Sequence, residues 1–315
     1  MFWLRLCVGL SVLDLILRRI DPRAATFHLS PLLLAAIGGA TGLLILSQAV
    51  AALRWKIILA DDRLPWAYLV RLYMIGSFFG LFLPTSVGGD AVRAIATARS
   101  SNRTGRAIAS VLIDRGFGVV ATMLYAVLGF ALEPDSIAIL AGDRIRWEAP
   151  NLASIGLALA AVGVAALLLS RSARVVSVWH DGRVIFADLA RSPQRLGKVL
   201  SLAVASQGLI VLLWYTLSRG MNLPLPGYMF LWAVPVVSLS ALLPVTFAGL
   251  GIREGVWLVL LAGTAIPRAN IVAFSLLYVV CNILVACTGG ILFVSQGLKV
   301  EPSGRAQEQR VLDVG

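Results

Sequence analysis

The sequence predicts an all-α integral membrane protein with about six full spans and two re-entrant hairpins broken by proline and glycine. Of its 315 residues, 59% are hydrophobic and only 14% are charged, whereas a soluble domain usually carries about 25% charged residues. Apolar runs of roughly 20 residues, the length that crosses a bilayer as a helix, recur along the chain. The net charge of +11 lies mainly between these runs, which favours topogenic charge and anionic lipid headgroups over nucleic-acid binding.

The predicted full spans are apolar and carry few charges; they are residues 2–18, 31–53, 107–132, 151–170, 199–218 and 270–296. The first is weak because Arg5 and Asp14 interrupt it. No small-residue cleavage site follows it, so we expect a retained helix rather than a signal peptide. Together the spans form one polytopic transmembrane domain over residues 1–298, followed by a polar cytoplasmic tail at 299–315 that is expected to be disordered. Most of the eight tryptophans fall near predicted span ends, as in an aromatic belt.

The distribution of basic residues orients the chain. Residues 171–198 hold more arginine and lysine than any other loop, interleaved with apolar side chains, which predicts an amphipathic segment at the cytoplasmic surface. Counting spans from there places 85–106 in the cytoplasm and both 133–150 and 219–227 outside. Both chain ends are then cytoplasmic in a bacterial-type inner membrane.

The segment 67–84 is expected to dip into the membrane and return rather than to cross it. A full crossing would put the preceding loop, with Arg54, Lys56 and Arg63, on the outside, against the positive-inside rule. Arg54 and Trp55 then lie at a span end, where we expect an interfacial anchor.

A repeated motif is the most informative feature. "LPTSVGGDAVRA" occupies residues 83–94 and "LPVTFAGLGIRE" residues 243–254, and the spacing from proline to arginine is the same in both. Proline and glycine break a helix, and such backbone survives at membrane depth only inside protein or beside a wet cavity. The expected helix-break residues are Pro84, Gly88, Gly89, Pro244, Gly249 and Gly251. Three predicted spans separate the copies, so the hairpins enter from opposite sides as an inverted repeat, a pointer to a transporter site. The alternative to a repeat is two unrelated helix breaks. Residues 255–266 form either the second arm of a hairpin or a full span, and the sequence leaves both open.

Charged residues beside the breaks are the candidate headgroup site. An arginine fork fits a phosphate, so Arg93 and Arg253 are expected to bind one, with Asp90 and Glu254 engaging a cationic headgroup or tuning the arginines. The alternative is internal pairing of each arginine with its neighbouring acid, or snorkelling to water. Neighbours on a helix do not face each other, so Asp114 and Arg115, also candidates, are expected to pair with other helices or to touch substrate.

The motifs "ALRWKIIL", "LPTSVGGDAVRA", "IDRGFG" and "LPVTFAGLGIREG" resemble the transmembrane region of the lysylphosphatidylglycerol synthetase family, over about residues 30–298. The resemblance implies a multi-spanning fold with two re-entrant elements, in a region that moves an aminoacylated anionic lipid across the bilayer. The soluble aminoacyltransferase domain of the full-length relatives does not follow here, so lysyl transfer is not carried over. The resemblance does not identify the lipid, because stand-alone relatives are linked to varied lipids, polyprenyl-phosphate sugars among them.

Three functions are therefore weighed. The first is a flippase-like translocator of an anionic or polyprenyl-phosphate-linked lipid, passive or ion-coupled since no nucleotide-binding motif is present. The second is an intramembrane transferase that uses Asp90, Asp114 or Glu254 on a lipid phosphate. The third is a non-catalytic subunit that works with envelope-lipid biosynthesis enzymes. Neither a cofactor nor a metal is expected, because His28 and His180 have no metal-ligand spacing.

Overall fold

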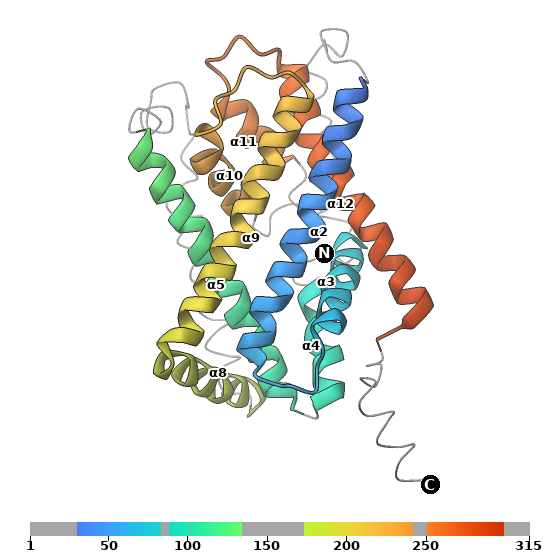
Figure 1. The fold of residues 1–315 in the computed structure, drawn as a ribbon, viewed down its shortest axis with the longest axis vertical. Helices are drawn as coiled ribbons and strands as arrows, with labels where there is room; N and C mark the ends of the chain where they lie inside the picture. The colour runs from blue at the N-terminus through green and yellow to red at the C-terminus, as the bar shows by residue number, and fades with distance from the viewer. Residues whose placement is uncertain (1–29, 83–87, 102, 134–172, 242–250, 299–315) are drawn as a thin grey trace, which may run out of the picture.

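Helices make up all the regular structure that the computed structural model describes, over residues 30–82, 88–101, 103–133, 173–241 and 251–298 (Figure 1). In chain order they are α2 (Pro31–Leu59), α3 (Trp66–Phe82), α4 (Gly88–Ser101), α5 (Thr104–Leu132), α8 (Ala173–Arg191), α9 (Pro193–Gly220), α10 (Met229–Ser240), α11 (Ile252–Leu260) and α12 (Arg268–Gln296). The predicted spans 2–18 and 151–170 and the tail lie outside the described residues.

Four long apolar helices, α2, α5, α9 and α12, form the body of the molecule. Each has 28 or 29 residues, about 42 Å or more at 1.5 Å per residue, and so exceeds the roughly 30 Å of a bilayer core. Their length and composition suit membrane crossing. They correspond to four of the six predicted spans, and they confirm the prediction of a helical membrane protein.

The helix boundaries follow from local chemistry. At the start of α2, the Ser30 hydroxyl accepts a hydrogen bond of 3.1 Å from the Leu33 amide, and Pro31 stands where no intrahelical donor is needed. The same helix ends at Leu59, and Ala60, which caps it, adopts the left-handed conformation at φ 48°. Because α2 continues to Leu59, Arg54 and Trp55 lie inside the helix rather than at its end.

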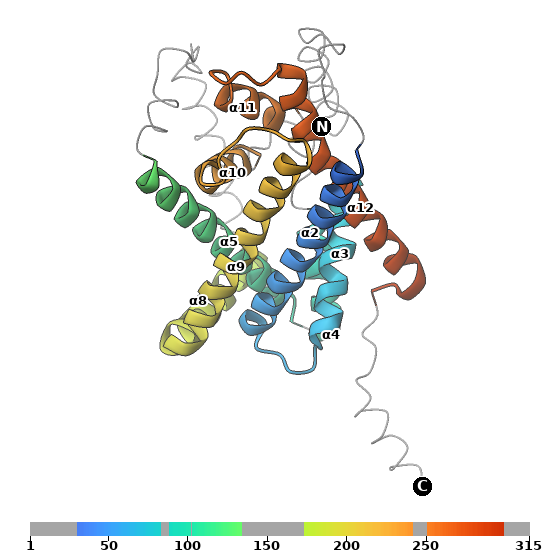
Figure 2. The ribbon, with the colours of Figure 1, turned by 45° about the horizontal axis from the view of Figure 1, so that its top comes forward.

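Two pairs of short helices lie at opposite ends of the molecule. Figures 1 and 2 show α3 and α4 beside the C-terminal end of α2 and the start of α5, whereas α10 and α11 lie near the C-terminal end of α9 and the start of α12. The second pair has only 12 and 9 residues, about 18 and 14 Å, too short to span a bilayer alone.

Helix α8 runs crosswise beneath α5 and α9 (Figure 1). One face packs inward, where Ile185 and Leu189 are buried against Ile58 and Val199. On another face, Trp179 is 70% exposed. The segment is therefore an amphipathic helix, as its sequence predicts.

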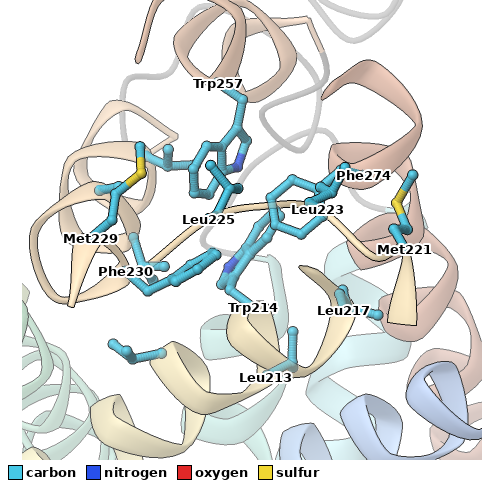
Figure 3. Packing of buried hydrophobic residues seen from close by; sticks show 14 of the residues in the cluster. Leu213, Trp214, Leu217, Met221, Leu223, Leu225, Met229, Phe230, Trp257 and Phe274 are labelled. Carbon is cyan, nitrogen blue, oxygen red and sulfur yellow. The ribbon is translucent and has the colours of Figure 1, made fainter. Parts of the chain in front are cut away.

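Aromatic rings join α10 and α11 to the long helices (Figure 3). Trp214 of α9 lies 5.1 Å from both Trp257 of α11 and Phe274 of α12, between ring centroids, and Phe230 of α10 packs beside them. Such pairs add about 0.5–1.5 kcal/mol each beyond area burial. The expectation of an aromatic belt is wrong for Trp214, Trp257, Trp55 and Trp232, which are at most 2% exposed. Their predicted position near span ends does not reveal that neighbouring helices cover them.

The backbone of α3 is approached closely by the backbones of two neighbouring helices. A Cβ on Gly89 of α4 would collide with the carbonyl of Gly76, and a Cβ on Gly289 of α12 would collide with the carbonyl of Met74. Glycine at these two positions lets α4 and α12 approach the α3 backbone directly. This close packing presents the first copy of the motif to the centre of the molecule.

Candidate functional site

A cavity of about 550 Å³, lined by apolar, polar and charged side chains, lies between the two copies of the motif. From the first copy, Gly89, Asp90 and Arg93 of α4 line it, and from the second copy Arg253 of α11 does. Side chains of α2, α3, α5, α9, α10 and α12 complete the wall. Two arginines that are far apart in the sequence thus line one cavity.

Asp114 organises the inner wall of the cavity. Its Oδ1 accepts a bond of 2.7 Å from Arg54 Nε, and its Oδ2 accepts one of 3.0 Å from Arg93 Nη2 and another from the Tyr73 hydroxyl. Asp114 is 2% exposed, and the two arginines are each 5% exposed. The carboxylate of α5 therefore ties α2, α3 and α4 together through buried charge-assisted hydrogen bonds.

Asp90 forms the second node of this network. Its Oδ1 accepts from Arg93 Nη1 at 3.1 Å, and its Oδ2 accepts from Arg115 Nη1. Arg93 is thus held between two carboxylates, with its guanidinium 3.7 Å from the ring centroid of Tyr73 and 4.2 Å from that of Trp55. The internal pairing of Arg93 with Asp90 that the sequence left open is present.

Arg253 has different surroundings. Its side chain is half-buried and its guanidinium lies 4.7 Å from the ring centroid of Tyr278. Within the described ranges, no acidic side chain lies within salt-bridge distance of it. Arg253 therefore presents its charge to the cavity with an aromatic face and no described carboxylate beside it.

Glu254 does not reach the cavity. It is fully buried. Its carboxylate accepts a hydrogen bond of 2.6 Å from the Gly251 amide and one of 2.9 Å from the Ser275 hydroxyl. These bonds cap the start of α11 and join it to α12. The geometry brings Arg93, Arg253, Asp90, Asp114 and Arg115 together and leaves Glu254 out.

The two copies of the motif differ in where their helix begins. Helix α4 begins at Gly88, five residues before Arg93, whereas α11 begins at Ile252, directly before Arg253. Gly251, at φ 84°, precedes α11 and adopts a backbone that favours glycine. Gly88 and Gly89 form the first residues of α4, and the remaining expected break residues, Pro84, Pro244 and Gly249, lie outside the described residues.

Arg54 is the site residue that sequence reasoning missed. The expectation of an interfacial anchor is wrong, because Arg54 and Trp55 are buried. The Trp55 indole donates a hydrogen bond of 3.1 Å to the Ser110 hydroxyl. The available signal was the continuation of the apolar pattern through "KIIL" after Arg54, which carries the helix a further turn.

The charged side chains of the described wall are four arginines (Arg54, Arg93, Arg115, Arg253) and two aspartates (Asp90, Asp114). Four positive against two negative charges leave a formal excess of +2. The part of the chain that the structure describes holds no group of three or more His, Cys, Asp or Glu side chains placed to bind a metal ion. The site is suited to holding an anion.

The fold and cavity define a multi-pass helical membrane protein with a polar, basic interior site. The chain matches the family described as "Lysylphosphatidylglycerol synthase TM region" over residues 2–290. It belongs to that family, which links it to membrane lipids. The searches of curated proteins and of solved structures gave no match.

Proposed function

We propose that this protein is a flippase-like translocator in a bacterial-type inner membrane, moving a lipid with an anionic phosphate or aminoacylated headgroup between leaflets. The observation that carries the proposal is the shared cavity, which Arg93 and Arg253 from the two copies of the motif both line. The headgroup occupies this polar space while the acyl chains stay in the surrounding lipid.

The two short-helix pairs are, in this proposal, re-entrant hairpins that reach the cavity from opposite sides of the membrane. Their positions at opposite ends of the molecule support this (Figures 1 and 2), as does the short length of α10 and α11. Paired broken helices around a central site are a recurring basis of alternating access.

An intramembrane transferase has less support. Its candidate nucleophiles or bases, Asp90, Asp114 and Glu254, all accept bonds from arginine, tyrosine, serine or backbone donors. A carboxylate held in this way is a weak base and a hindered nucleophile. Partnership with envelope-lipid biosynthesis enzymes stays a prediction.

The first test is transbilayer movement of a fluorescent, acyl-labelled phosphatidylglycerol in proteoliposomes. We expect the wild type to accelerate movement and Arg253→Ala to lose most of that acceleration, because its guanidinium faces the cavity. Arg93→Lys keeps a positive charge beside Asp90 and Asp114 but loses the planar fork that bonds both carboxylates at once. The inner wall of the cavity should then loosen, and movement should fall at least several-fold.

Arg219→Ala is the matched control, since Arg219 is exposed at the end of α9 and does not line the cavity. Its activity should equal that of the wild type. Unchanged movement in folded Arg253→Ala protein would contradict the assigned site. No acceleration by folded wild-type protein with any anionic lipid would contradict translocation itself.

A further inference from the structure

Both aspartates of the cavity are already neutralised by the protein. Each Oδ atom of Asp114 and of Asp90 accepts from an arginine. An ammonium group would have to displace one of these charge-assisted bonds before it could reach a carboxylate, and the bonds to Asp114 are buried on both sides. The described wall therefore has no free acceptor charge for a cationic headgroup.

Among the side chains that the structure describes around the cavity, the uncompensated charge is positive. Arg253 has no described acidic partner, and the neighbouring segments 83–87 and 242–250 contain no charged residue. Uncompensated charge in a low-dielectric space is costly, and a bound anion relieves that cost. The excess of two arginines favours a phosphate whose charge is not offset by an amine on the same headgroup.

The rest of the polar wall is neutral and can bind hydroxyl groups. Gln48 donates a hydrogen bond of 2.9 Å to the Ser77 hydroxyl, but its Oε1 has no described hydrogen-bond partner. The Nε2 of Gln207 has no described partner either. Both side chains line the cavity. Both atoms are buried, so rotation of each side chain toward the cavity would present an acceptor and a donor, and a hydroxylated headgroup would satisfy both.

We propose that the cavity selects a lipid phosphodiester whose headgroup is uncharged and hydroxylated, held by Arg253 and the two glutamines, and that it disfavours aminoacylated headgroups. This rests on the proposed function for the lipid nature of the ligand. It narrows that function to one class of substrate.

The test is a binding titration of the purified full-length protein in detergent with dihexanoyl phosphatidylglycerol and its lysylated form. The unmodified lipid should bind at least about tenfold more tightly, a difference of about 1.4 kcal/mol. Arg253→Gln should weaken phosphatidylglycerol binding about tenfold and leave lysyl-phosphatidylglycerol little changed, whereas the exposed control Arg219→Gln should alter neither.

Two comparisons separate the parts of the proposal. Gln207→Ala should weaken phosphatidylglycerol binding several-fold but not binding of dihexanoyl phosphatidic acid, which has no hydroxylated headgroup. Glycerol 3-phosphate, which has no acyl chains, should bind much more weakly than either lipid. Equal binding of glycerol 3-phosphate would assign the site to a soluble phosphate and overturn the proposal.

Equal or tighter binding of the lysylated lipid would overturn the selectivity even if the protein translocates lipids. Selective binding by protein that moves no lipid in proteoliposomes would uphold the selectivity and contradict the translocator instead.

Discussion

Asp114 is the residue on which the buried charges of the first motif depend. Its carboxylate accepts from two arginines that are each 5% exposed and from the hydroxyl of Tyr73. Without that carboxylate, Arg54 would lose the one acidic partner that the structure describes for it. A buried ion pair often adds little net stability, but removal of one partner is costly because the other charge stays buried.

We therefore expect Asp114→Asn to lower the free energy of unfolding by an amount of the order of 3 kcal/mol, measured by thermal unfolding of the detergent-purified protein. Asp188→Asn, at an exposed position of α8, is the control and should unfold like the wild type. Equal unfolding temperatures for the two variants would show that the network is not structurally required.

Single residues differ in how much of their surroundings the sequence reveals, and the reason is physical. Adjacent positions on a helix diverge by about 100°, so the sequence indicated that Asp114 and Arg115 must meet other helices, as they do. Direct contact of either residue with substrate was the alternative, and the sequence could not indicate which helices supply the partners. The partner Arg54 was misassigned because the apparent end of its apolar run was taken as the end of the helix.

At the element scale, helix α3 depends on glycine in its neighbours. A Cβ at Gly289 would meet the backbone of Met74, and backbone cannot be moved aside as a flexible side chain can. In contrast, a Cβ at Gly38 of α2 would meet nothing within 4 Å. The two glycines thus provide a matched pair of sites in long apolar helices.

We expect Gly289→Ala to destabilise the protein by about 1–3 kcal/mol through overpacking, read as a lower unfolding temperature. Gly38→Ala should be neutral or slightly stabilising, since alanine favours the helix by up to about 1 kcal/mol. An unfolding temperature of Gly289→Ala at or above that of Gly38→Ala would refute the close packing of α3 against α12.

Helix α8 has a face suited to the membrane surface. Trp179 and Phe186 are exposed and lie seven residues apart on one side of the helix, whereas Asp188 is nine residues from Trp179 and so lies about 180° away. Exposed aromatic side chains beside basic residues are typical of an interfacial helix.

A spin label on Trp179→Cys should therefore be more accessible to oxygen in lipid than to a water-soluble nickel chelate, and a label on Asp188→Cys should show the reverse. The measurement is collisional electron paramagnetic resonance in liposomes, with the native cysteines replaced. Greater chelate access at position 179 would place α8 away from the membrane surface.

At the scale of the whole molecule, the decisive feature is the orientation of the two short-helix pairs. The loop between α2 and α3 and the loop after α9 lie at opposite ends of the structure (Figure 1). Asp62 and Asn222 are exposed in these two loops. In the proposed topology they face opposite sides of the membrane.

In a cysteine-free background, Asp62→Cys should react with a membrane-impermeant maleimide only from the cytoplasmic side, and Asn222→Cys only from the outside. Right-side-out and inverted membrane vesicles give the two exposures. Labelling of both from one side would exclude opposite entry of the hairpins and, with it, the inverted repeat.

The sequence by itself determined the helical membrane class, the positions of the four long helices along the chain and the two motifs whose arginines share the cavity. Hydrophobic length and loop charge are local properties, and a bilayer converts them directly into helices. Only the tertiary structure decided the rest: Arg93 held between two carboxylates, Arg253 facing the cavity, Glu254 capping α11 and Arg54 joining the network. These outcomes depend on which helices meet and on where each helix begins after its break. Both follow from packing between segments far apart in the chain, such as α3 against Gly289.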